Sequence, residues 1–222
     1  MKNDWEFEEN PECCSYPYGK RLSVVSAFVC LVGFVLNVAA TRVCDFLVRS
    51  ADMRVIHDGI LIDVSAEHYF GLWAMKGSID TRAVILGTYE DDDTCYEYPS
   101  EYDKPDEMIV AQSMSIISCI LGGFSTFFFM SFACNNWQPA YCRLIAILLS
   151  IAIVTESLTF MFFNIPICDG HYDNTTIQVT SSAVSCEMST GAIMAAISMF
   201  YYLLSIGLVL KIAKVAMEKE AA

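Results

Sequence analysis

The sequence predicts an all-α membrane protein, a four-transmembrane-helix bundle with a small extracellular antiparallel β-sheet in its first outer loop. Two observations carry this prediction: four long apolar runs, and one long loop, rich in strand-forming residues, between the first two runs. Each run is long enough to cross a hydrocarbon core of roughly 30 Å as a helix. Asp, Glu, Lys and Arg are absent from these runs, except for Glu156 in the third. The runs are residues 22–41, 108–133, 144–167 and 188–210.

The composition agrees with a multi-span protein. Hydrophobic residues make up 55% of the 222 residues, which leaves little chain beyond the spans and one modest loop domain. The net charge of −13 comes from acids that lie almost entirely outside the spans, and the long loop alone is strongly acidic. An acidic surface repels phosphates, so nucleic acid is not an expected partner.

Basic residues predict the orientation of the spans. Lys and Arg gather beside the two termini and the short middle loop, whereas residues 168–187 contain neither. By the positive-inside rule both termini are cytoplasmic, and we expect the plasma membrane. A cleaved signal peptide at the first run is the alternative, which the length of the run and the acidic segment before it disfavour. The predicted organisation is a cytoplasmic tail 1–21, span 22–41, extracellular loop 42–107, span 108–133, cytoplasmic loop 134–143, span 144–167, extracellular loop 168–187, span 188–213 and cytoplasmic tail 214–222.

Four of the ten cysteines fall in the outer loops, namely Cys44, Cys95, Cys168 and Cys186. In an oxidising compartment this even number favours disulfides, and four cysteines allow three pairings. Cys168 and Cys186 bracket the second outer loop, so we expect them to pair and Cys44 to close onto Cys95. Zinc binding is the alternative, but no C-x-x-C or paired His spacing supports it. We expect no metal and no other cofactor.

Five positions are candidates for covalent modification. Asn174 begins an N-x-T sequon in the second outer loop and is a candidate for glycosylation. Cys13, Cys14, Cys134 and Cys142 lie near predicted cytoplasmic ends of spans, where reversible S-palmitoylation occurs. Unmodified thiols in a reducing cytosol are the alternative for these four cysteines.

The long first loop reads as a small β-sheet followed by an acidic tail. Turn signals at Asp58-Gly59 and Lys76-Gly77 separate runs of β-branched and apolar residues. The tail from residue 90 to 107 contains Asp91-Asp92-Asp93, which we interpret as a solvated surface, with a cation-attracting surface as the alternative. The predicted strands are Val43–Val48, Ile60–Val64, Tyr69–Met75 and Ala83–Leu86.

Glu156 is the one residue within the spans whose presence is costly. An ionisable group at the bilayer centre costs on the order of 3 kcal/mol, so its side chain is expected to face the bundle interior. Asn37 and hydroxyl groups of the first two spans are candidate partners, which would make the group a polar contact between helices. A proton or ion pathway is the alternative.

No pattern in the sequence predicts an enzyme. The three histidines, His57, His68 and His171, are isolated from any nucleophile or ligand partner, and no Gly-rich phosphate loop occurs.

The tripeptide Gly71-Leu72-Trp73, within a large first outer loop of a four-span chain, resembles the claudin and peripheral myelin protein superfamily. The resemblance implies that the tripeptide lies on a strand, and we expect the Trp73 ring to pack between the sheet and the helix ends. Family members usually carry two cysteines after the Trp, whereas Met75-Lys76 occupy that stretch here and only Cys95 follows. They also carry an upstream Trp, whose nearest counterpart is Phe46. With these departures, the chain is similar to divergent claudin-like proteins of algal or other protist type.

Three classes of function are open. The first is a claudin-like membrane organiser whose outer loops make lateral or cell-to-cell contacts, as at a cell junction. The second is a cation-selective channel or transport subunit, and the third is an accessory subunit of a larger membrane complex. The expected partners are the lipid bilayer and other membrane proteins, a second copy of this chain included.

Overall fold

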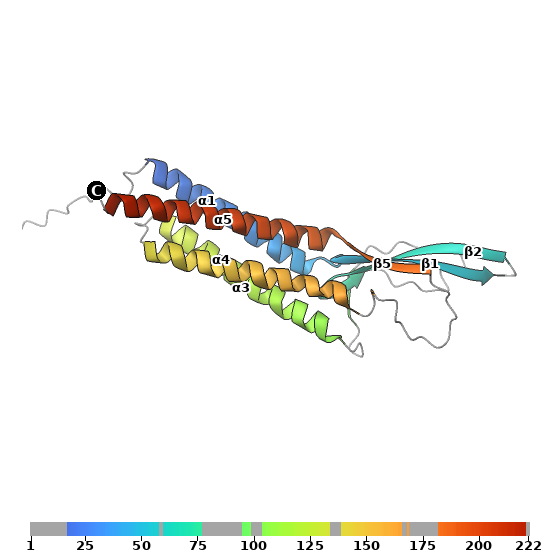
Figure 1. Ribbon diagram of the computed structural model, residues 1–222. Coiled ribbons are helices and arrows are strands. Elements are labelled where there is room, and N and C mark those ends of the chain that lie inside the picture. Colours follow the sequence, from blue (N-terminus) through green and yellow to red (C-terminus); the bar gives the residue numbers. More distant parts are fainter. Residues whose placement is uncertain are drawn as a thin grey trace, which may run out of the picture.

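The computed structural model describes residues 17–57, 60–76, 95–98, 104–133, 139–165, 168 and 182–220. Within these residues, four helices are long and apolar enough to cross a membrane, which confirms the predicted number (Figure 1). A short 3₁₀ helix, η1, continues directly from the third long helix. The helices are α1 (Pro17–Arg42), α3 (Asp106–Ala133), α4 (Pro139–Thr159), η1 (Phe160–Asn164) and α5 (Thr190–Glu220).

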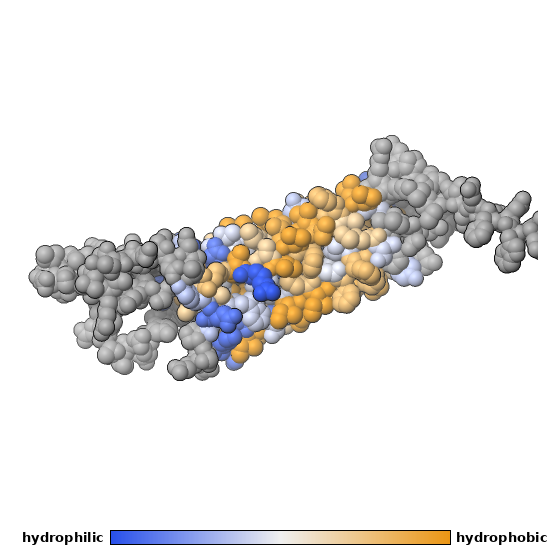
Figure 2. Space-filling view, turned by 180° about the vertical axis from the view of Figure 1, so that it is seen from behind, coloured by the Kyte–Doolittle hydropathy of each residue, from blue (hydrophilic) through white to orange (hydrophobic). Residues whose placement is uncertain are grey.

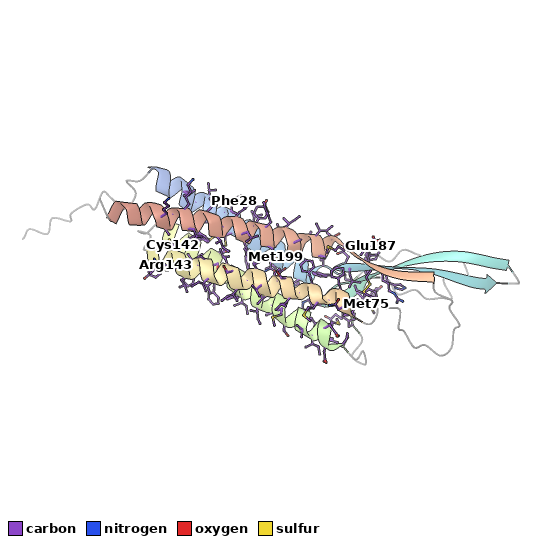
Figure 3. The ribbon with its side chains drawn as sticks, viewed as in Figure 1. Phe28, Met75, Cys142, Arg143, Glu187 and Met199 are labelled. Carbon is purple, nitrogen blue, oxygen red and sulfur yellow. A yellow bond between two sulfur atoms is a disulfide. The ribbon has the colours of Figure 1, made fainter. Side chains whose placement is uncertain are left out.

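The four long helices form a bundle with a sheet at one end. Helix α1 packs against α3 and α5, and α4 packs against the same two helices, so each helix has two neighbours. The sheet extends from one end of the bundle, and the C-terminus lies at the other end (Figure 1). Met75 and Glu187 lie where the sheet meets the helices, whereas Cys142 and Arg143 lie near the opposite end of the bundle (Figure 3).

The helices carry their large apolar side chains outward and their small or polar side chains inward. On α3, Ser115, Ser118 and Ser125 are fully buried, whereas Phe124 and Phe127 are exposed. The same arrangement occurs on α1, where Asn37 is buried and Phe28 is exposed. An apolar band therefore surrounds the middle of the bundle on the face seen in Figure 2.

Local sequence signals account for several helix ends. Helix α4 begins at Pro139, a position where the missing N–H of proline costs no helical hydrogen bond. Helix α3 has Asp106 and Glu107 in its first turn, where carboxylates interact favourably with the helix dipole. After η1 the chain leaves helical geometry at Ile165, whose extended backbone (φ −67°, ψ 146°) is the conformation that the following Pro166 requires.

The sheet contains strands from both loops. Its five strands are antiparallel, in the order β4-β3-β2-β1-β5. The prediction that the sheet lies in the first loop alone is incomplete, because β5 belongs to the second loop. The strands are β1 (Leu47–His57), β2 (Ile60–Phe70), β3 (Ala74–Lys76), β4 (Cys95–Glu97) and β5 (Ser182–Met188).

Strands β1 and β2 form a long hairpin whose register runs from Leu47 opposite Phe70 to His57 opposite Ile60. The first predicted strand began too early, because the chain bends before β1 starts at Leu47. The prediction that the Gly71-Leu72-Trp73 tripeptide lies on a strand was also wrong, since it forms the bend between β2 and β3. The predicted strand Ala83–Leu86 lies outside the described residues.

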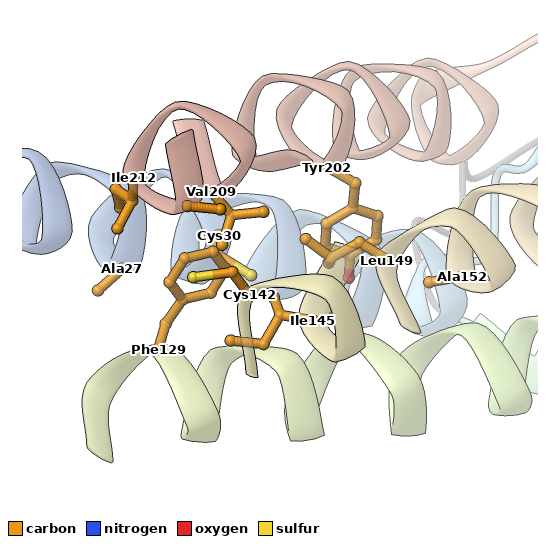
Figure 4. Packing of buried hydrophobic residues seen from close by; sticks show 11 residues of the cluster. Ala27, Cys30, Phe129, Cys142, Ile145, Leu149, Ala152, Tyr202, Val209 and Ile212 are labelled. Atoms are coloured by element: carbon orange, nitrogen blue, oxygen red, sulfur yellow. The ribbon is translucent and has the colours of Figure 1, made fainter. Parts of the chain in front are cut away.

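Two hydrophobic cores hold the molecule together. The bundle core lies toward the C-terminal end and contains Phe129, Ile145, Leu149 and Val209 (Figure 4). The second, which we call the junction core, lies where the helices meet the sheet. It includes Phe46, Leu47, Leu72, Met108, Phe162 and Ile165.

Two glycines make room for Tyr202, the largest fully buried side chain. A Cβ atom on Gly33 would lie 3.1 Å from the Tyr202 ring, and one on Gly122 would lie 2.9 Å from Tyr202 Cζ and contact its hydroxyl. The Tyr202 side chain of α5 therefore fits between α1 and α3 only because both positions lack a side chain.

Replacing Gly122 with alanine should destabilise the bundle. The added methyl group meets a buried ring that has no space to move into, and such overpacking costs about 1–3 kcal/mol. Gly207→Ala is the matched control, because a Cβ there has nothing within 4 Å. Thermal unfolding of the purified protein in detergent measures both variants. Equal melting temperatures for the two variants would contradict this account of the packing.

Candidate functional site

The segment Val43–Phe46 connects α1 to β1 and touches both loops. Its backbone makes hydrogen bonds in three directions: Phe46 N donates to Phe70 O (2.9 Å), Ser189 N to Phe46 O (3.2 Å) and Gly191 N to Asp45 O (3.0 Å). A Cβ on Gly191 would lie 2.7 Å from Val43 Cγ2 and 3.0 Å from Phe46 Cα. Only glycine allows α5 to begin this close to the segment.

Phe46 anchors this segment in the junction core. Its ring is fully buried and lies 5.8 Å from the rings of Phe160 and Phe162 and 6.1 Å from that of Phe163, centroid to centroid. The tilted and edge-on arrangements are those that aromatic pairs favour. Phe46 thus packs the entry to the sheet against η1.

The Gly71-Leu72-Trp73 bend fits against the same segment. A Cβ on Gly71 would lie 2.7 Å from Cys44 Cα and 2.8 Å from Ala74 O, so a larger residue has no room. Its carbonyl accepts a hydrogen bond from the Tyr98 hydroxyl (2.7 Å), and Gln112 Nε2 of α3 donates to Leu72 O (2.6 Å). The backbone of the bend is therefore fixed to both the sheet and the bundle.

Leu72, rather than Trp73, is the buried residue of the bend. The Leu72 side chain is 0% exposed and belongs to the junction core, whereas Trp73 is 40% exposed. The expectation that the indole packs between the sheet and the helix ends was therefore wrong. In a bend the alternation of a strand no longer applies, so sequence position alone does not tell which neighbour points inward.

Two disulfides fix the sheet to the helix ends. Cys44 is joined to Cys95, with Cα atoms 5.9 Å apart, and Cys168 is joined to Cys186, with Cα atoms 5.5 Å apart. This is the pairing that the sequence favours. The first disulfide connects the end of α1 to β4 at one edge of the sheet, and the second connects the chain after η1 to β5 at the other edge.

The outer part of the β1–β2 hairpin extends beyond the other strands. Strand β5 pairs with β1 only as far as Asp52, and β3 pairs with β2 only at Tyr69 and Phe70 (Figure 1). Among the described strands, none neighbours the outer edge of β1 from Met53 onward. Such edges present backbone N–H and C=O groups that can pair with another chain.

A second site lies inside the bundle, where each long helix contributes one polar residue. These are Asn37 of α1, Ser118 of α3, Glu156 of α4 and Tyr202 of α5, all of them buried. Asn37 Nδ2 donates to Ser118 Oγ (2.8 Å) and to the Tyr202 hydroxyl (3.4 Å). Ser118 and Asn37 also face the Glu156 carboxyl within hydrogen-bonding reach.

Glu156 and Asn37, singled out from the sequence, are thus brought together with a hydroxyl of the second span, as expected. Tyr202 was missed, because the glycines that make room for its ring lie on α1 and α3 and the sequence alone does not pair them with it. Cys119 Sγ completes the network by donating to Asn37 Oδ1 (3.3 Å). We call these five residues, Asn37, Ser118, Cys119, Glu156 and Tyr202, the core polar cluster.

Of the other predicted site residues, one lies in the bundle core and the rest lie outside the described residues. Cys142 is fully buried in the bundle core, which disfavours it as a palmitoylation site (Figure 4). Cys13, Cys14, Cys134 and Asn174 lie outside the described residues, as does the Asp91-Asp92-Asp93 run. Among the residues that the structure does describe, no group of three His, Cys, Asp or Glu side chains is placed to hold a metal ion.

Comparison with known proteins leaves the family open. No family model matches the chain, and no curated protein matches it.

Leu72→Ala should impair folding, whereas Trp73→Ala should leave folding unchanged. Removing the buried Leu72 side chain costs about 2–5 kcal/mol, so this variant should reach the cell surface poorly. Trp73→Ala removes an exposed ring and should reach the surface in normal amounts with both disulfides formed. Surface labelling together with thermal unfolding measures both variants. A folding defect in Trp73→Ala as large as that of Leu72→Ala would contradict the assignment of the buried residue.

Loss of either disulfide should destabilise the sheet. The disulfides close loops with sequence separations of 18 and 51 residues, and loops of this size correspond to about 3–4 kcal/mol in the chain-entropy account. Cys168→Ser with Cys186→Ser should therefore lower the unfolding free energy by roughly this amount. Cys119→Ser, which keeps a donor for Asn37, is the control. Peptide mapping without reduction tests the pairing directly, and free thiols at these positions would contradict it.

Proposed function

We propose that this chain is a claudin-like integral membrane protein of the plasma membrane, which organises membranes through protein contacts made by its outer sheet. One observation carries the proposal. The two loops form a single sheet that is fixed to the bundle at both edges, and a long hairpin projects from it with outer edges that no other described strand pairs. A rigid projecting hairpin suits contact with another protein better than it suits chemistry on a small molecule.

The surface of the bundle supports placement in a membrane. In water, a helix seldom exposes many large apolar residues while it buries polar ones, and here both occur. Phe124 and Phe127 of α3 and Phe200 and Leu203 of α5 are more than half exposed, while Ser118 of α3 and Ser198 and Ser205 of α5 are fully buried. In lipid this arrangement is favourable, because hydrocarbon solvates the apolar side chains and polar groups find partners inside.

The two ends of the bundle support an orientation with the sheet outside. Arg143 lies on the half of the bundle away from the sheet (Figure 3), and Lys211 and Lys214 lie in the later part of α5, which ends on the same side (Figure 1). The positive-inside rule expects basic residues there. Both disulfides lie at the sheet end, and disulfides persist in oxidising compartments. In this orientation both termini are cytoplasmic and Asn174 is accessible to glycosylation.

Two parts of the sheet are suited to different contacts. The hairpin edges beyond Asp52 suit strand addition, in which main-chain hydrogen bonds supply much of the affinity. Nearer the membrane, Trp73, Tyr96 and Met188 are large and exposed, and such residues are enriched at protein interfaces. The hairpin therefore suits contact with an opposing membrane, and the root of the sheet suits lateral contact.

Transport is the second candidate function, and the core polar cluster is the observation that favours it. A buried carboxyl among hydroxyls is a feature of ion and proton pathways in membranes. The experiment below therefore includes a conductance measurement.

A shortened hairpin tests the proposed function. Because Asp52 pairs with Ser65, residues 53–64 can be replaced by an Asn-Gly turn without changing the register at the root. We expect this variant to keep both disulfides, its surface expression and the co-purification of a second, differently tagged copy from the same cells, but to lose most association between cells that carry different tags. Gly207→Ala is the matched control and should retain partners.

The readouts separate the candidate functions. Co-purification from one cell population reports lateral contact, and mixed populations that carry different tags report contact between cells. Undiminished association between the mixed populations when both carry the shortened variant would contradict the proposed role of the hairpin. A cation current from the reconstituted wild-type protein, retained by the shortened variant, would favour transport in its place.

A further inference from the structure

The Glu156 carboxyl is buried, and among the described residues no basic side chain is placed to neutralise it. The side chain is 1% exposed and lies eight residues before the end of its helical segment at Asn164, about 12 Å along the helix. The four apolar runs contain no Lys, Arg or His. The titratable groups around the core polar cluster are Cys30 of α1, Cys119 of α3 and Tyr202 of α5, and none of them carries a positive charge.

The hydrogen atoms of Ser118 and Asn37, which face the Glu156 carboxyl, are shared with other acceptors. The Ser118 hydroxyl donates to Ala152 O (3.0 Å), and the Asn37 amide donates to Ser118 and Tyr202. One carboxyl oxygen, Glu156 Oε2, is buried and has no hydrogen-bond partner among the described residues. An ionised carboxylate has only acceptor sites, so this oxygen would carry charge with no donor to stabilise it.

A metal cation would be poorly held at this position. Asn37 turns its amide nitrogen, a donor, toward the shared hydroxyls, and its oxygen already accepts from Cys119. One carboxylate with two hydroxyls falls short of the six or more oxygen ligands that hard cations take. A proton needs only the one free oxygen.

We propose that Glu156 is a proton-binding site in the core of the bundle, with the proton held on the Oε2 atom that the rest of the cluster leaves without a partner. The bound proton removes the charge from the low-dielectric core and converts the acceptor without a partner into a hydroxyl. Folding of the chain then takes up one proton at neutral pH, because the same carboxyl is ionised when water reaches it in the unfolded chain.

Two further hydroxyls lie beside this site. Ser115 is one helical turn from Ser118 and Cys119, and Ser198 is one turn from Tyr202, both toward the sheet. Both are fully buried, and neither hydroxyl oxygen has a partner in the part of the chain that is described. Buried polar groups of this kind are usually satisfied by ordered water, which can carry a proton between the cluster and the sheet end.

Infrared spectroscopy and chemical labelling of the full chain in detergent test this proposal. Wild-type protein at neutral pH should show the carbonyl stretch of a protonated carboxylic acid, and this band should be absent in Glu156→Gln. Dicyclohexylcarbodiimide, an apolar reagent that modifies protonated carboxyls, should form an adduct that peptide mapping places on Glu156. Ser118→Ala, which leaves the carboxyl in place, should still be labelled.

The pH dependence of unfolding provides an independent readout. Because the folded chain binds one proton more than the unfolded chain, stability should fall as the pH rises through the neutral range. The unfolding equilibrium constant of the wild type should change by up to about tenfold per pH unit relative to Glu156→Gln, which has no proton to bind. Parallel pH profiles for the two proteins would overturn the proposal. So would a folded wild-type protein that shows neither the band nor the adduct, and this outcome can be read even where the Gln variant does not fold.

Discussion

The close approach of backbone at Val43–Phe46 is the constraint on which the rest of the structure depends. Within this segment the chain leaves the bundle, enters the sheet, and receives hydrogen bonds from the start of α5. The approach is possible because Gly71 and Gly191 add no side chain to the contact. The fixed segment positions the Phe46 ring in the junction core and Cys44 beside Cys95. It also sets the direction of the hairpin relative to the helices.

The packing of the bundle depends on a different constraint, namely that polar groups need hydrogen-bond partners inside it. Hydrocarbon offers no hydrogen bonds, so hydroxyls, amides and the carboxyl of the helices must meet one another inside. Small residues serve this requirement by letting helices approach, and Gly33 and Gly122 do so around Tyr202. The outcome is a core in which hydrogen bonds between helices, such as that from Asn37 to Ser118, lie among closely packed side chains.

Much of this could be predicted from the sequence, because the relevant signals are long or chemically distinctive. A membrane span is indicated by twenty or more consecutive apolar residues. The four outer cysteines allow only three pairings. Strand β5 was missed because its residues carry little local β signal, and it is a strand through pairing with β1 of the other loop. The burial of Leu72 in place of Trp73 is decided by tertiary packing in a bend, where no periodicity exists to be read.

Helix α3 joins the two sites, and this follows from the spacing of its buried polar residues. Gln112 donates to the carbonyl of Leu72 at the sheet, and Ser118 accepts from Asn37 in the core polar cluster. The two residues are six positions apart, less than two helical turns, and Ser115 lies between them on the same buried face. A rotation or shift of this part of α3 therefore moves both contacts, because residues fewer than two turns apart on one helix move together. The bend that carries the Gly-Leu-Trp tripeptide and the carboxyl of Glu156 are therefore held in register by one helix, which makes the position of the sheet depend on the packing of the bundle core.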